Sequence, residues 1–480
     1  GFGDLGYFEF REPRQAMAGI VIGAPHGRTE PDSLDYADWI SKKTGTGLVA
    51  AFGFKQNRLA VARPIVRSIV YGGLLDSPRR GGTIYPEFKN LLQKAAGGHL
   101  KFYVGLRFFP VGSHAARIET VASGLSFEEL RILKSAYIEI RDHVLRDSSI
   151  AEVPMVIDPL DPISWRIATV KHHGVLMRAE RGISLRLPSI LSTAEMKRAY
   201  RNILTRWVSR IIEIESDPPA SLPRLQVKVM AQGRLERIPA RNQRAGMVVG
   251  APHGTFDEYT AEMVKQICIR TGLPAVVAKG FSPTEGDGWR INVNRPTERR
   301  YPSGEIEMET ERARRVYSSF KQLVLAAAQG PLLLYVDIHQ NGREPNIQVA
   351  TLGVSKQQAQ VVKNEYRKIR DRILRDKPDL EAVDLLIEPI DSVEIGAWAA
   401  KTNGILRVSR MSLHIELPAY RVLQSSRSRG AYTEILAALL DRIAASHDPV
   451  QPPVFRADNR LSAPFSLHLG NEIAEDQTSN

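Results

Sequence analysis

The sequence has almost no cysteine and no long apolar run. The single cysteine among its 480 residues, Cys268, excludes an internal disulfide framework and any cysteine-rich zinc site. The longest apolar runs, such as residues 47–54, have the length of a strand and fall short of the ~20 residues that a transmembrane helix needs. We therefore expect no membrane span. A hydrophobic content of 43% and a charged content of 25% are typical of globular chains, which excludes collagen-like, coiled-coil and wholly disordered proteins.

Positive charge is in excess, with a formal net charge of +12. Nucleic-acid-binding proteins often have a similar excess of basic over acidic residues. Here, however, lysine and arginine are spread along the chain, often beside acids, as in residues 370–372. No basic stripe interleaved with aromatic residues occurs, so we expect no nucleic-acid partner. The chain begins at Gly1, from which we expect that an upstream piece was removed. A signal peptide there would imply a periplasmic or secreted protein instead of a cytoplasmic one; the sequence leaves this and the oligomeric state open.

The sequence contains two tandem copies of one unit. Residues 18–54 align without a gap on residues 245–281, and shorter matches continue in the same order until the copies end near Leu187 and Leu417. Each copy is far longer than a solenoid repeat and has the size of a whole domain. We predict a first copy over 1–220 and a second over 221–446, with a boundary in the proline-rich stretch 217–223, and an extended or disordered tail over 447–480.

The pattern of the second copy predicts an α/β domain with a mostly parallel or mixed central sheet. Short apolar runs at 246–251 and 275–278 predict strands on either side of a helix from about 257 to 271, which Gly272 ends. A continuous apolar run at 332–338 predicts a strand that is covered on both faces. A long helix over about 356–376 and a last strand over 412–417 complete the copy.

Polar residues stand where the strands of the second copy end, and ligands bind at this edge of open α/β sheets. These residues are His253, followed by Asp257 and Glu258, then His339, and Glu416. Two imidazoles and one carboxylate form a catalytic zinc set that leaves a fourth position for water.

Other residues of the second copy complete the predicted site. Asp337 faces the same side of its strand as His339 and could orient it. Glu416 is the candidate base. Asn294 and Arg295 form a planar fork that suits a substrate carboxylate. Taken singly, each residue also fits a tight turn, a hydrogen-bonded core histidine or a solvated side chain, and only their joint occurrence favours a metal site.

These motifs resemble those of the N-formylglutamate amidohydrolase family, which is related to the zinc carboxypeptidases and the aspartoacylase-type deacylases. The resemblance covers nearly all of each copy, and it is carried by short motifs at 252–254, 293–296 and 336–339 and by a late strand glutamate. It implies a phosphorylase/hydrolase-like three-layer α/β domain, one zinc ion, and hydrolysis of an amide next to a carboxylate-bearing residue such as glutamate.

The resemblance also implies a role for each matching residue. His253, an acid shortly after it and His339 would hold zinc, Asn294 and Arg295 would hold the carboxylate, and Glu416 would activate water. The chain departs from the carboxypeptidases at Phe256, where they place a glutamate ligand. We therefore take Asp257 as the second ligand, with Glu258 as the alternative.

The first copy lacks most of these residues. It keeps His26 and has Glu30 in line with Asp257, but Arg107 replaces His339, Ala62 replaces Asn294 and Arg186 replaces Glu416. An arginine cannot bind zinc, so we predict a catalytically inactive first copy.

The predicted function of the second copy is zinc-dependent hydrolysis of an N-acylated or peptidyl glutamate-like substrate with a free carboxylate. Two alternatives stay open. One is a carboxypeptidase-like peptidase acting on cell-wall or poly-γ-glutamyl peptides, and the other is a non-catalytic carboxylate-binding protein.

Overall fold

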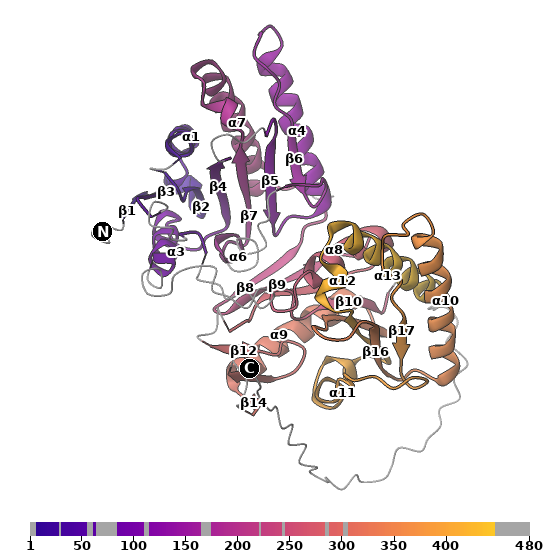
Figure 1. Cartoon of the computed structure of the whole chain (residues 1–480). Helices are drawn as coiled ribbons and strands as arrows, with labels where there is room; N and C mark the ends of the chain where they lie inside the picture. The colour runs from indigo at the N-terminus through magenta and orange to yellow at the C-terminus, as the bar shows by residue number, and fades with distance from the viewer. Residues whose placement is uncertain are drawn as a thin grey trace, which may run out of the picture.

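The computed structural model describes most of the chain in two sheet-centred domains (Figure 1). The predicted tail, 447–480, lies outside the described residues, as do parts of several loops. The described ranges are 6–27, 30–54, 61–63, 84–109, 115–164, 174–219, 222–241, 245–283, 288–300 and 306–446. Within these ranges, no helix is both long enough and apolar enough to cross a membrane.

The first domain is built on a seven-stranded mixed sheet. Its strands, in order across the sheet, are β1 (Tyr7–Arg11), β3 (Gly47–Phe52), β2 (Ile20–Ala24), β4 (Phe102–Phe108), β7 (Arg181–Leu187), β5 (Ile118–Ser123) and β6 (Met155–Asp158). One face is covered by α1 (Pro31–Thr44), α4 (Phe127–Leu145) and α7 (Ala194–Ser216), and the other by α3 (Ile84–Ala95) and α6 (Val175–Arg178). Short 3-10 turns occur at η2 (Gln15–Met17) and η3 (Ser189–Ser192).

The second domain is built on an eight-stranded mixed sheet. Its strands, in order, are β8 (Gln226–Met230), β9 (Gly233–Ile238), β11 (Ala275–Gly280), β10 (Met247–Ala251), β15 (Leu334–Gln340), β18 (Met411–Leu417), β16 (Ile347–Leu352) and β17 (Leu385–Ile387). One face is covered by α8 (Thr260–Thr271), α10 (Lys356–Leu374), α12 (Tyr420–Leu423) and α13 (Ser426–Ser446). The other is covered by α9 (Glu311–Ala328), α11 (Trp398–Asn403) and η4 (Ile405–Val408).

A small three-stranded sheet adjoins the second domain, formed by β12 (Trp289–Ile291), β13 (Thr297–Arg300) and β14 (Met308–Glu309). Between the two domains lies the β8–β9 hairpin (Figure 1). Its strand β9 pairs antiparallel with β11 and also packs against α6 of the first domain. The hairpin therefore belongs to the second sheet and contacts the first domain at the same time.

The first sheet and strands β9 to β17 of the second sheet have the same order and the same strand directions, and the second sheet has β8 in addition. In each, one strand (β1 or β9) pairs antiparallel with the first of four parallel strands. The last of these four pairs antiparallel with a strand that has one further parallel neighbour. The first helix of each copy also ends alike, because Gly45 after α1 and Gly272 after α8 both adopt a left-handed conformation, with φ of 76° and 70°. The duplication itself stays a prediction from the sequence.

The predicted α/β class with a mixed central sheet is confirmed. Most predicted elements of the second copy lie within two residues of their observed bounds, but the helix expected from 257 begins only at Thr260. Its first residues form turns instead, in which the Asp257 amide donates to the His253 carbonyl at 2.7 Å. The turn keeps the Asp257 side chain next to His253, with Oδ2 3.3 Å from Nδ1.

Candidate metal centre

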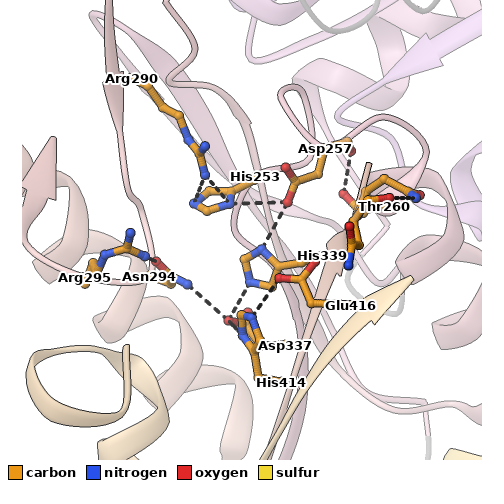
Figure 2. Close-up of polar contacts among 12 residues, drawn as sticks. His253, Asp257, Thr260, Arg290, Asn294, Arg295, Asp337, His339, His414 and Glu416 are labelled. Atoms are coloured by element: carbon orange, nitrogen blue, oxygen red, sulfur yellow. Dashed lines mark hydrogen bonds and ion pairs between the residues drawn. The ribbon is translucent and has the colours of Figure 1, made fainter. Parts of the chain in front are cut away.

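The predicted site residues come together at one edge of the second sheet, because the parallel strands β10, β15 and β18 end there side by side. His253 follows the end of β10, His339 lies near the end of β15, and Glu416 lies near the end of β18. His339 and Glu416 are direct partners in the strand register. The edge thus gathers residues that are far apart in the sequence (Figure 2).

His253, Asp257 and His339 form a compact group. Their ligand atoms all lie within 4.8 Å of one another, and all three residues are buried. Oδ2 of Asp257 is 3.0 Å from Nδ1 of His339 and 3.3 Å from Nδ1 of His253. Two imidazoles and one carboxylate at this spacing fit a zinc ion with one coordination position left over. Glu258 is absent from this group and lies beside Tyr259 instead, which favours Asp257 as the acidic ligand.

Asp337 orients His339 from behind. Its Oδ2 accepts from Nε2 of His339 at 2.8 Å, from Nδ1 of His414 at 3.3 Å and from the amide of Asn294 at 3.3 Å, while Oδ1 accepts from the Tyr335 hydroxyl at 2.9 Å. A carboxylate on the far nitrogen of a metal-binding histidine fixes the ring and its tautomer. Because Nε2 of His339 is bonded to Asp337, Nδ1 of the same ring faces His253 and Asp257.

Asp337, His339 and His414 also lie close enough to hold an ion. Because Asp337 already accepts four hydrogen bonds, its lone pairs are satisfied without a metal. We therefore take the group with His253 and Asp257 as the metal centre. The role of Asp337 in orienting His339, expected from the strand alternation, agrees with these contacts.

Charge at the centre is strongly perturbed by burial. Burial and the neighbouring Arg290 lower the pKa of His253 to about 3, so this imidazole is neutral, as a metal ligand must be. Burial also opposes charge on His339, but Asp337, Asp257 and Glu416 outweigh it and raise the pKa of His339 to about 10. Burial favours the neutral form of Asp257, yet the two histidines outweigh it and hold the pKa of Asp257 below its usual range. In the metal-free protein, the carboxylates therefore hold a proton on His339 that a bound cation would replace.

Arg290 is a site residue that the sequence did not reveal. Its NH2 lies 3.0 Å from Nδ1 of His253 (Figure 2). Its guanidinium carbon lies 4.0 Å from the centre of the Phe256 ring. The residue comes from β12 of the small sheet, a three-residue strand without a periodic pattern, so nothing in its local sequence indicated its position. Phe256 stands where a carboxypeptidase would have its glutamate ligand. Here its ring packs against the Arg290 guanidinium.

Glu416 lies beside the centre and outside the ligand group. It is buried, and its Oε1 is 3.1 Å from Nε2 of His414, whose other nitrogen faces Asp337. His414 was also missed, although its two-residue spacing from Glu416 places both side chains on one face of β18 and could have indicated it. The chain Asp337–His414–Glu416 fixes the predicted base next to His339.

Asn294 and Arg295 lie at the site, but in contacts with other residues. Asn294 is buried, and its amide bridges Asp337 and NH1 of Arg295, which donates to Oδ1 at 3.1 Å. Arg295 also donates through Nε at 2.8 Å and NH2 at 2.7 Å to Oε1 of Glu307. Arg295 thus already contacts a carboxylate of the protein, through two nitrogens that reach the same oxygen. Glu307 gave no sequence signal, since its partner lies twelve residues away across a loop.

No protein-family model and no curated protein sequence matches the chain. Several solved structures align with about half of it. A metallo-carboxypeptidase from Burkholderia cenocepacia aligns at 11% identity and a TM-score of 0.30, over 50% of this chain and 69% of that one. A succinylglutamate desuccinylase from Vibrio parahaemolyticus aligns at 19% and 0.27, over 47% and 65%. A bacteriophage poly-gamma-glutamate hydrolase aligns at 12% and 0.24, over 49% and 97%.

At these identities and TM-scores the alignments carry no argument about activity. The resemblance to the N-formylglutamate amidohydrolases therefore stays a hypothesis.

Proposed function

We propose that the second domain is a zinc-dependent amidohydrolase that cleaves an amide bond in an N-acylated or peptidyl glutamate-like substrate. The observation that carries the proposal is the buried group of His253, Asp257 and His339 with Glu416 on the adjacent strand. Zinc held by these three ligands would supply a Lewis acid and lower the pKa of a water molecule to about 7. The other residues of the site bind, orient and move protons.

Glu416 is positioned to act as the general base and then as the general acid. A carboxylate there can take a proton from the attacking water and return it to the nitrogen of the leaving amine. His414 holds the Glu416 carboxylate at 3.1 Å and is itself aligned by Asp337. Arg290, next to His253, places positive charge where negative charge develops on the carbonyl oxygen during attack.

Asn294 and Arg295 are proposed to bind the free carboxylate of the substrate. A guanidinium fork can recognise a carboxylate through two parallel hydrogen bonds. Arg295 already contacts one carboxylate oxygen, Oε1 of Glu307, through two of its nitrogens. A substrate carboxylate would have to share or displace Glu307. An N-formylated or otherwise acylated glutamate and the end of a glutamate-containing peptide present the same carboxylate, so both belong to the proposed substrate class.

The test is metal content by elemental analysis, with activity on N-acyl-glutamates and γ-glutamyl peptides. We expect about one zinc ion per chain, lost together with activity in His339→Ala. The matched control is His26→Ala in the first domain, which should keep the zinc and leave turnover within a few-fold. A protein that takes up no zinc even when zinc is supplied would contradict the proposal and favour a carboxylate-binding module. Equal loss of zinc in both variants would contradict the assignment to the second domain.

A further inference from the structure

The edge of the first sheet that corresponds to the metal centre carries arginines. Arg107 of β4 pairs with Arg186 of β7 in the strand register, as His339 pairs with Glu416 in the second domain. Arg63 stands in the sequence where the second copy has Arg295. We refer to Arg63, Arg107 and Arg186 as the arginine cluster.

The cluster is held in place by contacts within the domain. The Arg107 guanidinium lies against Nε2 of His26, the residue in line with His253. The guanidinium carbon of Arg186 lies 4.1 Å from the centre of the Phe109 ring. Each of the three arginines is half-buried and keeps a part of its surface in contact with solvent. Guanidinium groups held in this way lose less conformational entropy on binding a ligand than free side chains do.

Among the described residues, two carboxylates, Glu30 and Glu119, act on the charge of the arginine cluster. Glu30, which is buried, stabilises the charged forms of Arg107 and Arg186, and Glu119 stabilises the charged form of Arg186. The Glu119 carboxylate is also engaged elsewhere, since Oε1 accepts from Arg117 at 3.0 Å and from the backbone amide of Ser164 at 2.8 Å. Burial is the main cause that lowers the pKa of Arg107, and the like charges of Arg186 and Arg63 add to it.

A negatively charged ligand would relieve this crowding, and the second domain indicates which kind. There, the guanidinium of Arg295, in line with Arg63, binds a carboxylate through two of its nitrogens. A planar carboxylate matches the fork of an arginine, whereas zinc is excluded because arginine offers no lone pair to a metal.

We propose that the arginine cluster of the first domain is a binding site for a carboxylate-bearing ligand, such as a dicarboxylic acid or an acidic amino acid. The site binds without cleaving, because Arg107 and Arg186 replace a metal ligand and the base. The inference is independent of the activity proposed for the second domain, since it depends only on the first-domain arginines and on a carboxylate contact that is part of the fold.

The test is isothermal titration calorimetry of the full chain with glutarate, a dicarboxylate without an amide bond. The starting protein carries Arg295→Gln, so that binding at the second domain is weakened. We expect glutarate to bind this protein, and Arg186→Gln to lower its affinity on the order of tenfold or more, the loss typical of a charge-assisted hydrogen-bonded pair. Arg186→Lys, which keeps the charge but removes the fork, should recover only part of the affinity.

The control is a variant of an exposed arginine in the same domain, and inorganic phosphate is the second probe. Arg146→Gln removes one exposed charge after α4 of the same domain and should leave the affinity within about twofold, in keeping with screened surface charges. If Arg186→Gln does not fold, Arg63→Gln replaces it with the same expectation. No glutarate binding, or equal loss in Arg146→Gln, would overturn the site. Tighter binding of inorganic phosphate than of glutarate would overturn the carboxylate assignment.

Discussion

Substitution of Glu236 by glutamine should strongly destabilise the protein, because this carboxylate balances three buried cations. It lies 3.0 Å from Nε of Arg234, 2.7 Å from Nζ of Lys265 and 3.6 Å from Nζ of Lys279. Glu236, Arg234 and Lys279 are each 0% exposed, and Lys265 is 7% exposed. Removing one partner of a buried ion pair costs about 3–5 kcal/mol, since the remaining charge stays desolvated without compensation.

The same substitution tests the junction between the domains. NH1 of Arg234 donates to the carbonyls of Leu176 at 3.0 Å and Ala179 at 2.6 Å in the first domain, and NH2 donates to that of Glu180 at 2.7 Å. Loss of the Glu236 carboxylate therefore leaves a desolvated cation at the contact between β9 and α6. The destabilisation should extend to both domains if they unfold together.

Differential scanning calorimetry measures the effect. A loss of 3–5 kcal/mol corresponds to a fall in Tm on the order of 10 °C for a domain of this size. The matched control is Glu262→Gln, because Glu262 is partly exposed and lies 3.9 Å from Lys279, so its loss should cost less than ~1 kcal/mol. A Tm of Glu236→Gln within about 1 °C of the wild type would refute the reasoning and show that water or a rearrangement compensates the cations.

The pH dependence of this effect has a definite sign. Burial favours the neutral form of Glu236, but Lys265, Lys279 and Arg234 outweigh it and hold its pKa well below the usual value. A carboxylate with a lowered pKa contributes stability that is fully present above its unfolded pKa, near 4.3, and is lost as the pH falls towards the folded pKa. The difference in Tm between wild type and Glu236→Gln should therefore be largest near neutral pH and shrink below about pH 4.

Two further predictions concern the proposed active site. Glu416→Gln should keep zinc at the wild-type level by elemental analysis and lower kcat by about 10²–10⁴-fold, the contribution of a general base; loss of zinc would instead make Glu416 a ligand. Glu307→Gln should lower KM for substrates with a free carboxylate and leave kcat within a few-fold, because Arg295 would no longer be engaged by a charged competitor. A higher KM in steady-state kinetics would show that Glu307 positions Arg295 for binding.

Much of the fold and part of the site could be predicted from the sequence, because the signals were local. Apolar runs marked the strands, and Gly272 marked the end of α8. His253, His339 and Glu416 each follow or end a predicted strand, so the rule that sites lie at carboxyl edges was enough to group them. The start of α8 was wrong by three residues, because the turn that holds Asp257 beside His253 overrides a weak helical pattern.

Residues brought in by tertiary packing could not be predicted in this way. Arg290 lies in β12, and Glu307 directly precedes β14. Both are brought to the site by the pairing of these strands with β13, which no local pattern indicates. His414 differs, because its alternation with Glu416 on one strand placed it on the correct face and only its function was overlooked. Arg295 was found, but its partner was not, so its present contact with Glu307 could be learned only from the structure.

At corresponding register positions, the second domain has a histidine of the group proposed to hold a metal cation and the first has an arginine. In the second domain, His253, Asp257 and His339 form a group that fits a zinc cation, and in the first the Arg107 guanidinium occupies the place of His339 and lies against His26. A metal ion and a guanidinium both attract carboxylates, but only the metal lowers the pKa of a bound water. Exchange of a histidine for an arginine at one register position would therefore remove catalysis while leaving the attraction for anions. A tandem protein that has undergone this exchange in one copy would keep two sites for the same class of ligand and chemistry at only one of them.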